Sequence, residues 1–153
     1  MSYQDFKQAL KLATDHKYFV SGTGLTAEEI KKAEGILGLE FSSQMIEFYK
    51  NFNYISFDGC EIFGINFDDS DIFEGNSLTY ALHERKEYAL SKKWLPIYNY
   101  GDGSLAFLDY SCLNIDREPA VIRCFYNGEQ YQKMENAAED FGSFLLSLIK
   151  ENC

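Results

Sequence analysis

The clearest structural signals in this 153-residue sequence lie in Leu25-Thr-Ala-Glu-Glu-Ile-Lys-Lys-Ala-Glu-Gly-Ile-Leu-Gly-Leu-Glu-Phe41. Thr26 and Glu29 have the spacing of a capping box, in which each side chain binds the backbone N–H of the other residue at a helix start. Gly38 stands where a helix commonly ends in the left-handed conformation. The stretch therefore predicts a helix between Thr26 and Gly38, with three residues on its buried face: Ile30, Ala33 and Leu37.

Two further helices are predicted beside this one. The first lies near the start of the chain, where apolar residues recur at spacings of three and four: Tyr3, Phe6, Leu10 and Ala13. The other begins after a cap at Ser42 or Ser43 and has three residues on one face: Met45, Tyr49 and Phe52.

The pattern changes after Asn53 from helical spacing to short β-type runs. Residues 54–63 form two such runs around Asp58-Gly59, which is a strong hairpin signal. Asn76 or Ser77 then caps a predicted helix that extends to about Leu90. Its inward residues are predicted to be Leu78, Ala81 and Tyr88, which leaves His83-Glu84 exposed.

The last part of the sequence predicts more strands and a closing helix. Strands are expected over 94–100, 104–108 and 120–125, with a turn at Gly101-Asp102-Gly103, and a helix from about Ala137. Helices, then a mostly antiparallel β-sheet, then a C-terminal helix indicate an α+β fold. The length and the absence of a low-complexity linker predict a single domain over residues 1–153.

The charge balance bears on the class of partner. Fourteen Lys and Arg residues against 24 Asp and Glu residues give a net charge of −10, the wrong sign for nucleic acid or anionic membrane surfaces. A basic protein is a better partner, although simple solubility explains the charge equally well. The first residues lack the basic and apolar segments of a signal peptide, so we expect a cytoplasmic protein.

The acidic residues are concentrated in the middle of the chain. No Lys or Arg occurs between Lys50 and Arg85. This block and the aromatic turn after it form the predicted partner-binding surface, because acidic and aromatic side chains suit a basic protein. A solvated loop and an ordinary hairpin turn remain the alternatives. The candidate residues are Asp68, Asp69, Asp71, Glu74, Tyr98, Tyr100 and Asp102.

Catalytic and metal-binding patterns are lacking, so we predict no enzyme activity, no bound metal and no cofactor. The two histidines, His16 and His83, have no zinc-type partner at the required spacing. The acidic loop lacks the glycine and glutamate positions of an EF-hand. The cysteines form no C-x-x-C pair and are expected to be free thiols: Cys60, Cys112, Cys124 and Cys153.

The order of these segments resembles the SUKH superfamily, which includes bacterial immunity proteins and fungal cell-wall-assembly regulators. The resemblance begins at residues 25–41 and continues through the helix from Met45 to Phe52. The later matching positions are Ile62-Phe63-Gly64, Leu95-Pro96-Ile97, Gly101-Asp102-Gly103, Leu108-Asp109, residues 119–122, and Phe141 with Phe144-Leu145.

The resemblance implies an antiparallel α+β fold without catalytic activity. For a bacterial member it implies an immunity protein that binds and neutralises a toxin, often a nuclease, whose basic cleft suits an acidic partner. The fungal members imply the alternative, an intracellular scaffold or regulator of cell-wall assembly that acts through protein–protein contacts. Neither the identity of the toxin nor the oligomeric state follows from the sequence.

Overall fold

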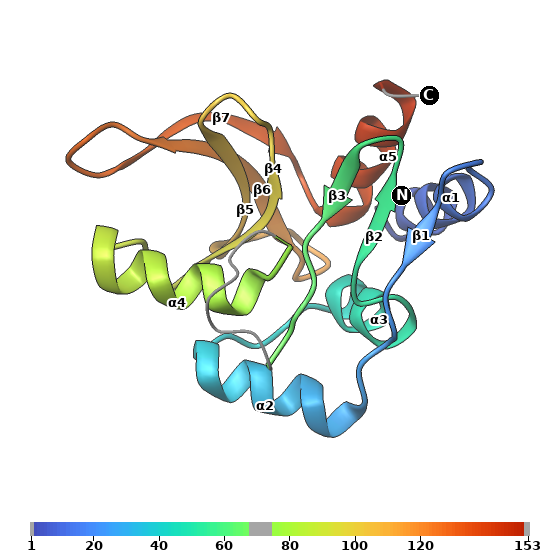
Figure 1. Ribbon diagram of the computed structural model, residues 1–153, viewed down its shortest axis with the longest axis horizontal. Helices are drawn as coiled ribbons and strands as arrows, with labels where there is room; N and C mark the ends of the chain where they lie inside the picture. Colours follow the sequence, from blue (N-terminus) through green and yellow to red (C-terminus); the bar gives the residue numbers. More distant parts are fainter. Residues whose placement is uncertain (1, 68–74, 152–153) are drawn as a thin grey trace.

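The computed structural model describes residues 2–67 and 75–151 of the chain (Figure 1). Within these residues it has helices at both ends of the sequence and two antiparallel sheets, which confirms the predicted α+β class. The elements in chain order are α1 (Ser2–Thr14), β1 (Val20–Ser21), α2 (Ala27–Leu37), α3 (Ser43–Asn51), β2 (Ile55–Phe57), β3 (Cys60–Ile62), α4 (Ser77–Tyr88), β4 (Trp94–Asn99), β5 (Ser104–Leu113), β6 (Pro119–Tyr126), β7 (Tyr131–Ala138) and α5 (Phe141–Glu151).

Helix α2 forms where its capping signals stand. Thr26 Oγ1 accepts a hydrogen bond from Glu29 N at 3.1 Å, and Glu29 Oε1 accepts one from Thr26 N at 3.0 Å. Gly38 ends the helix with a φ of 68°. These contacts satisfy backbone groups that a helix terminus leaves without partners. Ser42 caps α3 as predicted, by accepting a hydrogen bond from Met45 N at 3.5 Å.

The two sheets are separate, and a single hydrogen bond is described between a residue next to β3 and strand β4. The smaller sheet has the strand order β1-β2-β3, and the larger has the order β4-β5-β6-β7. The predicted hairpin is confirmed in β2 and β3, where Asp58 (φ 48°) and Gly59 (φ 84°) make the left-handed turn that favours tight hairpins. Past the end of β3, Phe63 N donates a hydrogen bond to Ile97 O of β4 at 2.9 Å.

The first half of β5 is buried on both faces of the four-stranded sheet. Ala106 and Leu108 of β5 belong to the main core, together with residues of α1, α3 and α5. Leu105 and Phe107 point to the opposite face, into a smaller cluster beside α4. In Figure 1, α4 and the β6–β7 hairpin lie on the same side of the molecule, away from the chain termini. Because both faces are covered, β5 has a continuous apolar run rather than an alternating one.

The two terminal helices pack against each other at very short range. The rings of Phe6 in α1 and Phe141 in α5 have centroids 6.1 Å apart. Gly142 allows this approach, because a Cβ atom at that position would lie 2.7 Å from Cβ and 2.8 Å from Cα of Phe6. Gly142 N also donates to Gln44 Oε1 at 2.8 Å, which ties α5 to α3.

The predicted start of the closing helix at about Ala137 is wrong. Ala137 and Ala138 end strand β7, and Ala138 pairs with Val121. Helix α5 begins at Phe141, directly after Asp140, whose Oδ1 accepts a hydrogen bond from Ser143 N at 2.9 Å. The sequence does not indicate β7, because an exposed edge strand lacks the apolar alternation of a half-buried one. Strand β1, only two residues long, likewise has no sequence signal.

Helix α4 lies where it was predicted, but two of its residues differ from the prediction in whether they are buried or exposed. Asn76 caps it as expected, and Leu78 and Ala81 are buried. Tyr88, predicted to point inward, is 40% exposed, whereas Glu84, predicted to be exposed, is only 7% exposed. Tyr131 at the start of β7 binds Glu84 on the inward side of the helix, and the sequence does not predict β7.

None of the helices in the two described ranges combines the length and the apolar character that a membrane span requires.

Candidate functional site

The predicted residues Tyr98, Tyr100 and Asp102 lie in β4 and in the turn between β4 and β5. The turn is exposed, and Gly101 (φ 82°) and Gly103 (φ 95°) both adopt left-handed conformations, so the predicted glycine turn is confirmed. The structure therefore brings the three residues together at one end of the four-stranded sheet.

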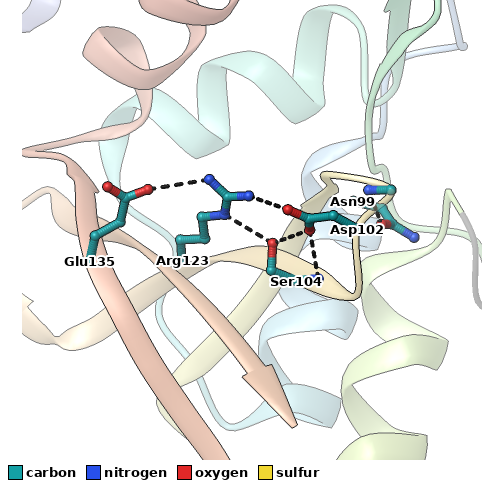
Figure 2. Close-up of polar contacts among 6 residues, drawn as sticks. Asn99, Asp102, Ser104, Arg123 and Glu135 are labelled. Atoms are coloured by element: carbon teal, nitrogen blue, oxygen red, sulfur yellow. Dashed lines mark hydrogen bonds and ion pairs between the residues drawn. The ribbon is translucent and has the colours of Figure 1, made fainter.

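Asp102 is bound to Arg123 across this end of the sheet, as Figure 2 shows. Arg123 Nη2 lies 2.5 Å from Asp102 Oδ2, and Nη1 lies 3.4 Å from Glu135 Oε2. Arg123 Nε donates to Ser104 Oγ at 2.9 Å. The guanidinium carbon also lies 4.0 Å from the centroid of the Tyr100 ring, which is a cation–π contact. One guanidinium thus holds two carboxylates and a tyrosine ring.

The electrostatics of the turn follow from these contacts. Hydrogen bonds from the side chain and backbone of Ser104 lower the pKa of Asp102, and the charge of Arg123 lowers it further. Burial raises the pKa of Tyr100, while Arg123 acts in the opposite direction. Since Asp102 and Glu135 outnumber the single guanidinium, the turn remains acidic even though Asp102 is paired.

Tyr98 is a packing residue as much as a surface residue. Its hydroxyl donates to Cys60 Sγ at 3.9 Å, and its ring meets those of Tyr100 and Phe144 edge-on at 5.0 and 5.8 Å. Burial, followed by the interaction with Cys60, raises the pKa of Tyr98 to about 12. Of the three residues at the turn, Asp102 is the most accessible to a partner.

The other four predicted residues, Asp68, Asp69, Asp71 and Glu74, lie outside the described residues.

Replacing Asp102 with asparagine should make the stability less sensitive to acid. Because the folded-state pKa of Asp102 lies below its ordinary value, the ionised carboxylate stabilises the fold above about pH 4, and this contribution disappears as the pH falls toward the lowered pKa. Urea unfolding should show that the free energy of unfolding falls more between about pH 5 and about pH 3 for the wild type than for Asp102→Asn. Equal losses would contradict the role assigned to Asp102.

A groove of about 630 Å³ lies on the other side of the β4–β5 turn, between α4 and the β6–β7 hairpin. We call it the tyrosine groove. Gly101 and Gly103 border it, so the groove and the turn form one continuous surface. The side chains that define it are Tyr80, His83, Glu84, Tyr88, Tyr126 and Tyr131.

Glu84 is the buried charge of the tyrosine groove. Tyr131 donates a short hydrogen bond to Glu84 Oε1, and His83 Nδ1 lies 2.7 Å from Oε2. Burial raises the pKa of Tyr131, and the contact with Glu84 raises it further, so its hydroxyl stays protonated and able to donate. This hydrogen bond ties α4 to β7 and holds the carboxylate in place.

The tyrosine rings form a connected series along the groove. The centroids of Tyr88 and Tyr126 are 4.8 Å apart, and those of Tyr126 and Tyr131 are 5.5 Å apart, both in edge-on geometry. Tyr131 continues the series to Phe107 in the smaller core cluster, also at 5.5 Å. Each edge-on contact occupies one face of one ring and fixes the orientation of both rings.

The ionisable side chains among the described residues that line the groove are Glu84, His83 and the tyrosines. His16 lies elsewhere, where its Nδ1 accepts a hydrogen bond from Tyr18 N at 3.1 Å in the turn after α1. No group of three metal-ligand side chains occurs within residues 2–67 and 75–151. Cys60 and Cys124 are buried free thiols, and Cys112 is an exposed one.

The sequence analysis missed two sets of residues at this surface. Arg123 and Glu135 complete the network at the turn, and Glu84 with its tyrosines forms the groove. Tyr126 and Tyr131 flank a second glycine turn at Gly128, which is a weak hairpin signal that could have indicated β7. Nothing local to Glu84 indicates that it is buried.

Comparison with protein-family models gives a match over residues 24–147, to the family described as SMI1 / KNR4 (SUKH-1). This chain belongs to the SMI1 / KNR4 family. The match confirms the predicted resemblance to the SUKH superfamily, and it spans both the turn and the tyrosine groove. SUKH proteins generally lack enzymatic activity and act by binding other proteins, as immunity proteins or related regulators. A search of curated proteins returned no match.

Proposed function

We propose that this SMI1 / KNR4 family chain is a non-enzymatic, cytoplasmic immunity protein that binds and neutralises a basic protein toxin, such as a nuclease. The observation that carries the proposal is the acidic and aromatic surface at the β4–β5 turn, beside the tyrosine groove. Family membership and the net charge of −10 support it. Complementary charge accelerates association with a basic partner and disfavours acidic ones.

The proposed contact surface combines the acidic block with the turn. Asp68, Asp69, Asp71 and Glu74 supply charge, while Tyr100 and Asp102 supply an aromatic face and an exposed carboxylate. Tyr98 supports the turn from behind. Asp102 can contact a partner through its exposed edge without leaving Arg123, since an ionised carboxylate accepts up to about four hydrogen bonds.

The first test is genetic. The proposal expects a toxin-like reading frame beside the gene, and expression of that toxin should be lethal unless this chain is co-expressed. The scaffold alternative, a regulator of cell-wall assembly, expects neither. Survival that does not depend on this chain would contradict the immunity role.

The second test concerns how the complex forms. Charge reversal of Asp68, Asp69 and Asp71 to lysine should slow association with the purified toxin by roughly tenfold at low salt. Salt above about 0.1 M, where the Debye length is about 10 Å, should slow the wild type steeply. Stopped-flow association measured at several salt concentrations gives both quantities.

A matched control separates local from overall charge. Reversal of three exposed carboxylates outside the acidic block (Asp15, Glu40 and Glu139) produces the same net charge. This control should slow association much less than the first variant. If both variants and the wild type associate at the same rate and with the same salt dependence, the acidic block serves solubility alone.

A further inference from the structure

Glu84 is a buried carboxylate with unused acceptor capacity in a groove open to solvent. It is only 7% exposed, yet it lines the tyrosine groove. Within the described residues its contacts with Tyr131 and His83 use one position on each oxygen. A carboxylate accepts about four hydrogen bonds, so a donor that enters the groove can bind the remaining positions.

The walls of the groove suit a flat cation. Tyr88 and Tyr126 stand edge-on to each other, 4.8 Å apart, and Tyr131 continues the series beside Glu84. Tyrosine faces attract cations, and a planar guanidinium can stack on them while it donates to a carboxylate. A buried carboxylate beside several tyrosines therefore has the chemistry of an arginine site.

The same arrangement occurs within this chain, with its cation present. On the other side of the β4–β5 turn, Arg123 lies over the Tyr100 ring at 4.0 Å and pairs with Asp102 and Glu135 (Figure 2). The described residues that line the tyrosine groove include neither arginine nor lysine. The groove thus has the carboxylate and the rings of such a site, with His83 as the basic side chain among its described lining residues, so an arginine of another molecule can supply the guanidinium.

We propose that the tyrosine groove binds an arginine side chain of the protein partner. The guanidinium donates to Glu84 and lies against the rings of Tyr88 and Tyr126, stacking on the face of one of them. The inference rests on the proposed function in one respect, that the partner is a basic protein. It adds a specific anchor to the diffuse attraction of the acidic surface, because buried, aromatic-lined contacts to arginine dominate binding energy at interfaces.

The probe for the test is Nα-acetyl-arginine methylamide, titrated into labelled protein and followed by NMR. We expect saturable shifts at Tyr88 and Tyr126, with a Kd on the order of 1 mM. The citrulline derivative has the same shape without charge and should give no saturable shift. The lysine derivative should bind more weakly than the arginine derivative. Equal or tighter binding of either control would overturn the proposal.

Variants on one helix identify the carboxylate. Glu84→Gln should weaken binding of the arginine probe by roughly tenfold, since a charge-assisted hydrogen bond is lost. Glu87→Gln removes the same charge from an exposed position on the same helix and should change the Kd by less than about twofold. Equal effects of the two variants, with both proteins folded, would show that Glu84 is not the binding group.

A second variant keeps the test decisive if Glu84→Gln disturbs the fold. Tyr88→Leu alters a residue that is 40% exposed, so the fold should tolerate it, and it should weaken probe binding by roughly threefold to tenfold. Undiminished binding would overturn the proposal. If the arginine probe binds but the toxin experiments fail, the immunity role is wrong and the arginine site stands. If the toxin binds but the arginine probe does not, the arginine site is wrong and the immunity role stands.

Discussion

Phe48→Ala should lower the free energy of unfolding by about 3–5 kcal/mol, the usual cost of removing a buried aromatic side chain. Phe48 is fully buried in α3, and its ring centroid lies 5.1 Å from that of Phe141 in α5 and 5.7 Å from that of Tyr49. The substitution removes the packing between α3 and α5 and leaves a cavity among rigid aromatic neighbours. Since a whole domain is stable by only about 5–15 kcal/mol, the variant should be close to unfolding at 37 °C.

Urea denaturation followed by circular dichroism measures this loss. Ile115→Ala is the control, because Ile115 is 97% exposed at the β5–β6 connection and its truncation should change stability by less than about 0.5 kcal/mol. A loss below about 1.5 kcal/mol for Phe48→Ala would mean that α3 and α5 do not share the packing described here.

Gly142→Ala should destabilise the fold by about 1–3 kcal/mol, the usual cost of forcing extra atoms into a packed region. A Cβ atom at this position would lie within 2.8 Å of the backbone N and Cα of Phe6, so α1 would have to move away from α5. Glycine-to-alanine changes within helices normally stabilise, because alanine is the better helix former. The expected sign is therefore opposite to the one that helix propensity predicts.

Gly35→Ala is the matched control for this effect. Gly35 lies in α2, where a Cβ atom would meet no neighbouring residue within 4 Å, so alanine there should stabilise by about 0.5–1 kcal/mol. Opposite signs for the two variants in thermal unfolding are the expected result. If both stabilise, the α1–α5 contact is looser than the structure shows.

Some residues of the candidate site can be predicted from their neighbours in the sequence, and others are brought to the site only by the tertiary structure. The glycine turn with Tyr98, Tyr100 and Asp102 was identifiable from neighbouring residues alone. The partner of Asp102 was not, because Arg123 lies 21 residues away and reaches Asp102 only through the pairing of β5 with β6. An acidic residue that the sequence places on an open surface is thus already paired, which changes what it can offer a partner.

The sequence by itself determined the local elements of this protein: the capped helix α2, the cap of α3, and the hairpin turn at Asp58-Gly59. The caps depend on side chains that bind backbone groups three residues away, and the turn depends on two adjacent residues that tolerate positive φ, so the necessary information is contiguous. Tertiary structure alone decided strand β7 and the surroundings of Glu84. Strand β7 exists because β6 supplies its hydrogen-bond partners, and Tyr131 at the start of β7 then binds Glu84 of α4. The tyrosine groove depends on both, since no local interaction joins Glu84 of α4 to Tyr131, which lies 47 residues further along the chain.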